Sequence, residues 1–442
     1  MTKRRIWIVG AALLPLSLAC LGSWWLLGRM SVGTYRHALN HPEAGKDTLA
    51  GEIRAACGEV SRRFWVNADD QRYVTDPRAH SNEVYRYIVL DAALLAAPPC
   101  TSRIVRAAAD VVRMHGRLHR AEGGNWSEAT RLITAEMIPL LEQAGAHAEL
   151  ARAWRLVALT RQIAGAYGLA GEAILKVVTH ARAAGDDRLL TRGALGLTFN
   201  ALYGSTTVQE ALQQCEGFVT GEMSDRLVQG LIKCKLAQLR AMGGDFAAAR
   251  AMYHEARNVF EELGPSVKVA TTSCDLAYIE LLADDPAAAE RAVRADYDAL
   301  VQLGANYLLS GLGVILARAV RGQGRDEEAL ELTRTVEASA ADDDVDAQVL
   351  WRAIRAPILA RAGKMAEAHS LALAAVKRAR RTEMPALHGL ALVEFSTVLH
   401  LAGRIEEACA AVTEAVAIYS AKGDVVSTAR SKDLLARIES AR

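Results

Sequence analysis

This chain of 442 residues has few aromatic side chains. It also has almost no net charge, and its cysteines are not regularly spaced. Aromatic residues make up only 5%, and the abundant Ala and Leu favour helices, which argues against an all-β fold. Lys and Arg number 52 against 51 Asp and Glu, so the chain lacks the basic surplus of a protein that binds nucleic acid across its whole surface. Seven irregularly spaced cysteines exclude a small disulfide-rich domain, and the six outside the N-terminal apolar run are predicted to be buried thiols.

Motifs that carry chemistry are also missing. The sequence contains no H-E-x-x-H, G-x-S-x-G, G-x-G-x-x-G, paired C-x-x-C or phosphate-binding G-x-x-x-x-G-K-[ST] pattern. His115 and His119 stand four residues apart, as do His37 and His41, but no further ligand supports a metal site at either pair. We therefore expect a protein that is not an enzyme, takes no cofactor or metal, and binds neither nucleic acid nor a small-molecule substrate.

The N-terminus combines a basic tail with a long uncharged run. Residues 1–5 include Lys3, Arg4 and Arg5, and residues 6–28 are uncharged. As a helix this run would rise about 35 Å, enough to cross a hydrocarbon core of about 30 Å, so we predict an uncleaved transmembrane anchor. The basic tail predicts a cytoplasmic N-terminus and extracytoplasmic repeats. A cleaved signal peptide, a lipoprotein signal at Cys20 and repeats on the cytoplasmic side are the alternatives.

A short pattern recurs through the rest of the chain: an apolar helix ends, a turn residue follows, and a helix rich in Ala or acidic residues begins. The turns lie 39 to 41 residues apart, at Gly124, Gly165, Gly204, Gly244, Asp284, Gly324, Gly363 and Gly403. A second set of breaks lies roughly halfway between them, at Gly145, Gly185, Gly264, Gly304 and Gly423. Each repeat is thus predicted to be a pair of helices, an A helix before the first turn and a B helix after it.

The turn residues suit this arrangement. Glycine readily adopts the left-handed conformation that closes a helix, and an Asp or Ser beyond it can cap the next helix, as predicted for Ser127, Asp245 and Asp285. Small residues early in the B helices should let the paired helices approach closely; these are Ala248, Ala288, Ala329, Ala368 and Ala408. Because one pair cannot bury its apolar face alone, neighbouring pairs must stack into a solenoid.

The predicted fold is therefore all-α, a right-handed solenoid of about eight helix–turn–helix repeats over residues 100–424. Residues 29–99 are predicted to form a linker and a divergent helical cap, and residues 425–442 a polar capping helix. Trp126, Trp154 and Trp351 lie at helical spacing among apolar residues and are predicted to belong to the core.

These units resemble tetratricopeptide repeats (TPRs), although their period of about forty residues exceeds the usual 34. The elongated repeats are similar to the C-terminal helical regions of bacterial class III adenylate cyclases with an added ATPase module, and of related NTPase-linked regulators. The resemblance covers roughly residues 120–440 and is carried by the segments LLADDPAAAERAV, RGQGRDEEALELT and LAGRIEEACAAV. It implies the regulatory, protein-contacting half of such a system, because the cyclase and nucleotide-binding modules have no counterpart in this chain.

Charge is distributed unevenly between the two kinds of helix. The A helices carry more Lys and Arg than Asp and Glu, and the B helices carry the reverse. In TPR-like stacks the A helices line the concave face, so the pattern predicts a locally basic groove that takes an acidic segment. Alternatively, these charges are solvated or pair with acids of the B helices. The candidate groove residues are Arg155, Arg192, Asn200, Lys233, Lys235, Arg240, Asn306, Arg318, Arg352 and Arg355.

The sequence thus predicts a membrane-anchored TPR-like scaffold that binds a protein or an acidic peptide segment. The alternative is a regulatory or sensor subunit, related to the repeat half of cyclase- or NTPase-type signalling proteins, which acts on a separately encoded effector.

Overall fold

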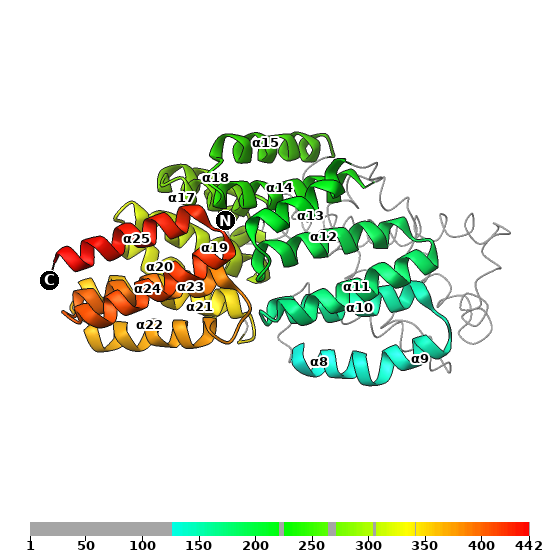
Figure 1. Ribbon diagram of the computed structural model, residues 1–442, viewed down its shortest axis with the longest axis horizontal. Helices are drawn as coiled ribbons and strands as arrows, with labels where there is room; N and C mark the ends of the chain where they lie inside the picture. The colour runs from blue at the N-terminus through cyan, green and yellow to red at the C-terminus, as the bar shows by residue number, and fades with distance from the viewer. Residues whose placement is uncertain (1–125, 221–224, 264–270, 304–305, 341, 442) are drawn as a thin grey trace, which may run out of the picture.

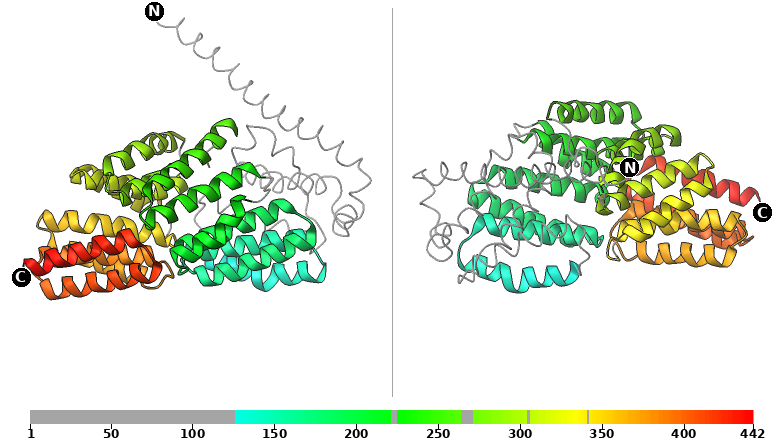
Figure 2. Two further views of the ribbon diagram at one scale, coloured as in Figure 1. Left: turned by 45° about the horizontal axis from the view of Figure 1, so that its top comes forward. Right: turned by 180° about the vertical axis from the view of Figure 1, so that it is seen from behind.

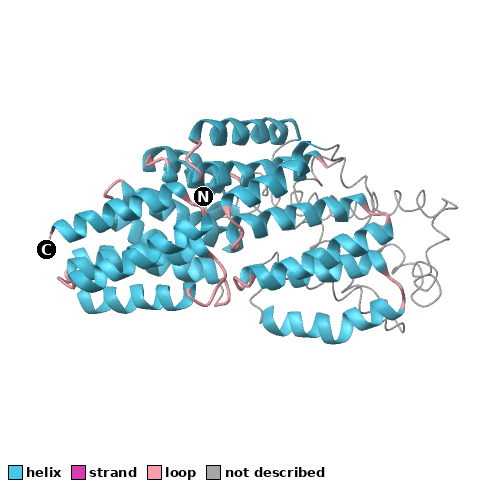
Figure 3. Ribbon diagram, viewed as in Figure 1, coloured by secondary structure: helices cyan, strands magenta, loops and turns pink. Residues whose placement is uncertain are grey.

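The computed structural model describes residues 126–441 except 221–224, 264–270, 304–305 and 341, and this part of the chain is helical without any strand (Figure 3). It opens with a B helix in three pieces, α8 (Trp126–Leu132), the π-helical turn η2 (Ile133–Met137) and α9 (Ile138–Gln143). Seven hairpins of an A and a B helix follow. The predicted all-α, TPR-like solenoid is therefore confirmed for the described residues.

The A helices of the seven hairpins are α10 (His147–Ile163), α12 (Asp187–Tyr203), α14 (Arg226–Met242), α17 (Ser273–Leu282), α19 (Asn306–Gly322), α21 (Val345–Arg361) and α23 (Pro385–Leu401). The B helices are α11 (Tyr167–Ala184), α13 (Val208–Thr220), α15 (Phe246–Leu263), α18 (Pro286–Leu303), α20 (Asp326–Ser339), α22 (Met365–Ala379) and α24 (Ile405–Lys422). The last helix is α25 (Val425–Ser440), in the segment for which a C-terminal capping helix is predicted. Figure 1 shows the hairpins in order.

The predicted turns are mostly confirmed. Eight of the predicted glycines have φ between 62° and 92°, and Asp284 adopts φ 63° where the other repeats have glycine. Gly204 is different: it ends α12 in an extended conformation at φ −80°. Asp245 and Asp285 cap their helices as predicted, by accepting hydrogen bonds from backbone N–H groups three residues later at 3.0 and 2.8 Å. Gly124, Gly264 and Gly304 lie outside the described residues.

Small residues near the start of the B helices are buried within the hairpins. In the later repeats Ala329, Ala368 and Ala408 are fully buried, as predicted. In two earlier repeats the fully buried residue is the next one, Ala249 or Ala289, so the predictions at Ala248 and Ala288 are wrong by one position. The half-buried Ala248 and Ala288 instead donate the capping hydrogen bonds at the helix starts, through their backbone N–H groups.

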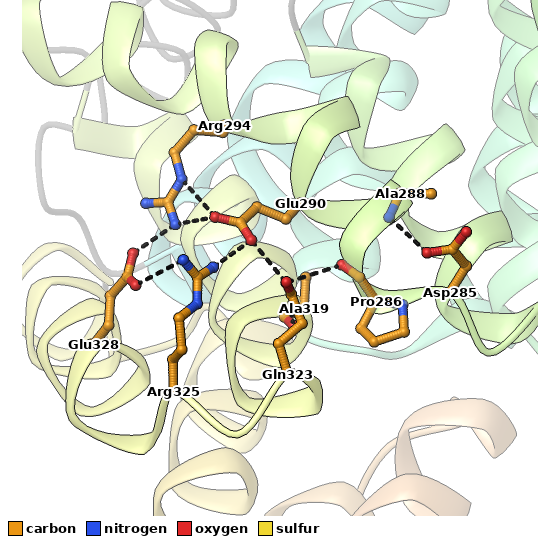
Figure 4. A network of polar contacts seen from close by, with 9 residues as sticks. All are labelled: Asp285, Pro286, Ala288, Glu290, Arg294, Ala319, Gln323, Arg325 and Glu328. Carbon is orange, nitrogen blue, oxygen red and sulfur yellow. Dashed lines mark hydrogen bonds and ion pairs between the residues drawn. The ribbon is translucent and has the colours of Figure 1, made fainter.

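Consecutive repeats are also joined by charged side chains at the turns. Glu290 on α18 accepts hydrogen bonds from Arg294 at 2.6 Å, from Gln323 at 2.7 Å and from Arg325 at the start of α20 (Figure 4). Arg294 and Arg325 also reach Glu328 on α20. The Arg325 bond, with help from Arg294 and Gln323, holds the pKa of Glu290 at about 2 despite its partial burial. The network fixes the angle between two neighbouring hairpins.

The solenoid curves until its last repeat touches earlier ones, which no repeat pattern in the sequence indicates. Lys422, at the end of α24, is 1% exposed and donates hydrogen bonds to the backbone carbonyls of Ala201, Gly204 and Thr206 at 2.8, 2.7 and 2.6 Å. Apolar side chains join the same contact, since Val426 on α25 packs against the core of the α12–α17 repeats. The orange and red repeats accordingly lie against the green ones in two views (Figures 1 and 2).

Several predictions concern residues that the structure does not describe. The anchor at 6–28, the linker and cap at 29–99, and the two His pairs all lie outside the described part of the chain. Within the described part, no helix is both long and apolar enough to span a bilayer.

Candidate functional site

The candidate site is the face of the A helices that turns toward the inside of the curve. The A helices are closely packed along this face. Arg321 on α19 forms an ion pair with Glu394 on α23, although α21 lies between these two helices in the sequence of repeats. One guanidinium N–H lies 2.8 Å from the Glu394 carboxylate, and the other N–H group also bonds to it. Helix α21 is buried along most of its length, so little of the inner face between α19 and α23 is open.

Arg318 lies one turn before Arg321 and is the most distinctive side chain on this face. It is half-buried, and it makes no hydrogen bond or ion pair with any residue that the structure describes. Burial lowers its pKa, which Tyr278 on α17, Glu394 and Tyr419 on α24 only partly offset. A guanidinium has five N–H donors and stays charged at neutral pH, so Arg318 is a cation to which none of the described acidic side chains is bound.

The tyrosines beside Arg318 complete the site, which we call the Arg318 site (Arg318, Arg321, Tyr278, Glu394 and Tyr419). Burial raises the pKa of Tyr278; Asp424 adds to the rise and Arg318 opposes it. Burial likewise raises the pKa of Tyr419 well above its usual value. Both phenols are therefore neutral at pH 7 and able to donate a hydrogen bond. The Tyr419 phenol donates to the carbonyl of Ala386 at 3.5 Å. A guanidinium with no acidic partner among the described residues, beside the neutral phenol of Tyr278, is suited to a carboxylate, because its N–H groups and the phenol can donate to the carboxylate oxygens.

Most of the other predicted groove residues are engaged elsewhere. Three of them bond to acidic side chains on B helices: Lys233 to Glu255 at 3.0 Å, Arg240 to Glu216 at 2.6 Å and Arg355 to Glu337 at 2.7 Å. These three contacts are of the kind described by the alternative interpretation, in which A-helix bases pair with B-helix acids.

Lys235 takes part in a buried ion pair. Its ammonium lies 2.5 Å from the carboxylate of Asp275, which is 1% exposed, and Gln238 donates to the same oxygen. Burial alone would lower the pKa of Lys235, but Asp275 and Tyr203 outweigh it and raise the pKa above its usual value. The ammonium also lies 4.8 Å from the centre of the Phe199 ring. Lys235 therefore joins α14 to α17 and offers no free charge to a ligand.

Arg352 and Arg355 both stack on Trp351, at 4.0 and 4.4 Å from its ring, and Arg352 also donates to the backbone and side-chain oxygens of Gln348 at 2.6 Å. Trp351 is 3% exposed, so its predicted place in the core is confirmed. Cation–π stacking and local hydrogen bonds hold these bases against α21.

The remaining predicted residues are spread along the array. Asn200 is held between helices, because its amide donates to the carbonyl of Tyr167 and accepts from Gln162, both at 2.7 Å. Arg192 lies 3.8 Å from the carboxylate of Asp225, which caps α14. Arg155 is half-buried on α10, and Asn306 is the first residue of α19. Asn200 and Arg192 thus have partners outside the Arg318 site.

The sequence did not predict three residues of the site, Tyr278, Tyr419 and Glu394. The sequence around an aromatic or acidic residue in an apolar helix does not indicate which face of the helix that residue occupies. Cysteines fit the expectation in part: Cys215 and Cys234 are buried, whereas Cys274 and Cys409 are half-buried, and all four are free thiols. The described ranges contain no cluster of three or more His, Cys, Asp or Glu residues that could hold a metal ion.

No family model matches the chain, and no curated protein matches it. One of the solved structures that it matches is a Signal Transduction ATPase with Numerous Domains (STAND) protein with a tetratricopeptide repeat sensor, from Pyrococcus horikoshii. The identity is 11% and the TM-score 0.39, and the match covers 87% of this chain. The chain spans 56% of that protein's length. The fold assignment rests on the helical hairpins described above.

Proposed function

We propose that this chain is a TPR-like interaction protein whose inner face binds an acidic segment of a partner protein and which performs no chemistry itself. One observation supports the proposal: the cation of Arg318 lies close enough to Tyr278 and Tyr419 to act on their pKa values, and no residue that the structure describes provides a carboxylate bound to it. A half-buried charge has lost part of its hydration, and a carboxylate from a ligand would compensate for that loss.

The proposal includes a membrane anchor at residues 6–28 with the repeats on the extracytoplasmic side. Its support is the uncharged run itself and the three basic residues that precede it. A reporter enzyme that is active on only one side of the membrane, fused after Arg442, tests the orientation. Activity only in the cytoplasm would contradict it.

A second candidate is a regulatory subunit that acts on a separately encoded effector. The contact of Lys422 with the end of α12 favours this candidate, because a solenoid that closes on itself can exist in a closed and an open form. Co-purification of a cyclase or an ATPase with the repeats on the cytoplasmic side would favour this candidate over an exported scaffold.

The inner-face proposal is tested with a fluorescent peptide of eight glutamates and a matched peptide of eight lysines, titrated with the full-length chain and followed by anisotropy. We expect binding of the glutamate peptide only. Arg318→Gln should weaken it by about tenfold to a hundredfold, since a hydrogen bond to a charged group contributes about 1.5–3 kcal/mol.

Arg334→Gln is the matched control, because Arg334 is 61% exposed on α20 and pairs only with the exposed Glu331 in the described part of the chain. It should bind the peptide as the wild type does. Equal losses in the two variants, or no binding of the glutamate peptide by the wild type, would contradict the proposal.

A further inference from the structure

Two side chains of the last repeats bond to the carboxyl ends of earlier helices, in addition to the loop before α23, where the Glu383 N–H donates to the carbonyl of Gly165 at 2.9 Å. Lys422 donates to three carbonyls at and just beyond the end of α12, where Gly204 is extended and leaves the final carbonyls without the usual closing turn. Arg430 on α25 donates to the carbonyls of Leu281 and Leu282, at the end of α17, at 3.0 and 2.8 Å. Both are cations at the negative end of a helix dipole, where a positive charge is stabilising.

These contacts join positions far apart in the sequence. Lys422 and its carbonyl partners are separated by 216 to 221 residues, and Arg430 and its partners by 148 or 149. They are therefore tertiary contacts between the ends of the curve, and the hairpins on either side can keep their own packing without them.

The same stretch of chain forms part of the wall of the Arg318 site. Tyr419 lies three residues before Lys422, and its phenol is close enough to Arg318 for each to shift the other's pKa. Asp424 lies two residues after Lys422, caps α25 through the Ser427 N–H at 2.9 Å, and acts on Tyr278. Moving Lys422 away from α12 must therefore also move one side of the Arg318 site.

Helix α25, which follows Lys422, is exposed on its outer side. Among the described residues of α25 only Ser431 and Ile438 are buried, and Val425 is 60% exposed. A terminal helix that packs on one side and is exposed on the other belongs to the less stable part of a structure.

From this arrangement we infer that Lys422 and Arg430 form a latch that closes the solenoid over the Arg318 site, and that release of the latch gives a partner access to it. The inference rests on the proposed function for its second half, whereas the latch itself can be measured without any ligand. If only a fraction of the molecules is open, the apparent affinity for the partner falls by that fraction, and weakening the latch should restore it.

The test compares the full-length wild type with Lys422→Met and with Lys432→Met, a control that changes an exposed lysine of α25. Hydrogen exchange is read at the amides of Gly204 and Ala211, which bond to Asn200 and Thr207 on either side of the Lys422 carbonyls. We expect Lys422→Met to lose at least tenfold protection at both amides and to bind the eight-glutamate peptide at least fivefold more tightly. Lys432→Met should match the wild type in both measurements.

Arg430→Gln provides a second variant, in case Lys422→Met does not fold; it removes the contacts to the end of α17 and the ion pair with Asp284 at 3.6 Å. It should show the same tighter binding, with protection lost at Ala283, whose amide bonds to Ile279 at the end of α17. Unchanged protection in the folded variants would overturn the latch. Lost protection with unchanged peptide affinity would overturn its control of the site, and absence of peptide binding in every form, wild type included, would overturn the proposed function instead.

Discussion

Reversing the charge of Lys235 should destabilise the protein severely, whereas the same change two residues earlier, at Lys233, should have little effect. Lys235 is 12% exposed and its partner Asp275 is 1% exposed, so Lys235→Glu would place two carboxylates together away from water. Breaking a buried ion pair costs about 3–5 kcal/mol, and the repulsion between the new pair adds to this. That is a large share of the roughly 5–15 kcal/mol by which proteins are usually stable.

Lys233 differs in its surroundings although it lies on the same helix. Its partner Glu255 is 63% exposed, and Lys233 itself is 24% exposed. Exposed ion pairs contribute only about 0–1 kcal/mol because water screens both charges. Lys233→Glu should therefore lower the free energy of unfolding by no more than about 1 kcal/mol, plus a small repulsion from Glu255.

The assay is urea unfolding of the full-length single variants, followed by circular dichroism at a helical wavelength, with Lys235→Met as an additional variant. Met fills a similar volume without a charge but leaves Asp275 unpaired, so it should lie between wild type and Lys235→Glu. Equal shifts of the urea midpoint for Lys233→Glu and Lys235→Glu would contradict the prediction. They would show that the buried Lys235–Asp275 pair contributes no more to stability than the exposed Lys233–Glu255 pair. A double charge reversal at 233 and 235 is correspondingly a poor probe of partner binding, because loss of binding would reflect unfolding.

Two further predictions concern other sites. Glu290→Gln should lower the free energy of unfolding by about 1–2 kcal/mol at pH 7, after allowing for the solvent screening of partners such as Arg325. The folded-state pKa of Glu290 is depressed to about 2, so this stability is present above about pH 4.5 and is lost as the pH falls toward 2. The unfolding curves of the wild type and Glu290→Gln should therefore converge near pH 2. Gly389→Ala should destabilise by about 1–2 kcal/mol, because its new methyl group would lie 2.6 Å from the buried ring of Tyr419. Gly311→Ala, with nothing within 4 Å, should instead stabilise its helix by up to about 1 kcal/mol in thermal unfolding, and the reverse order would refute the packing argument.

The hairpins could be predicted because the signals that set them are local. A glycine at φ near 75°, as at Gly363 and Gly403, is needed where a helix ends in a left-handed turn, and the sequence shows it directly. The caps at Asp245 and Asp285 are local in the same sense, since donor and acceptor are three residues apart. Local signals did not predict which alanine is buried, since Ala249 is buried where Ala248 was predicted. The face that a residue occupies depends on the angle at which the next hairpin packs.

The closure of the curve could not be predicted, since it depends on geometry accumulated over several repeats. A lysine in the last turn of a helix, followed by glycine, is an ordinary helix end, and nothing in the sequence around Lys422 distinguishes it from an exposed lysine. Its carbonyl partners lie more than 200 residues away and become neighbours only after the solenoid has turned on itself. A small change in the rotation between repeats would separate them.

The groove was predicted by summing charge over helices, and the structure shows why a sum overstates the positive field. A base whose nearest neighbour is an acid at 3 Å or less, as at Lys233 and Arg240, contributes a short dipole, and its field falls away within a few ångströms. What a distant ligand senses is the charge left after this pairing, and among the residues that the structure describes Arg318 is one such charge. Recognition there depends on one cation in a partly dehydrated setting, so it should be selective for a single well-placed carboxylate and respond less to salt than a continuous basic stripe would.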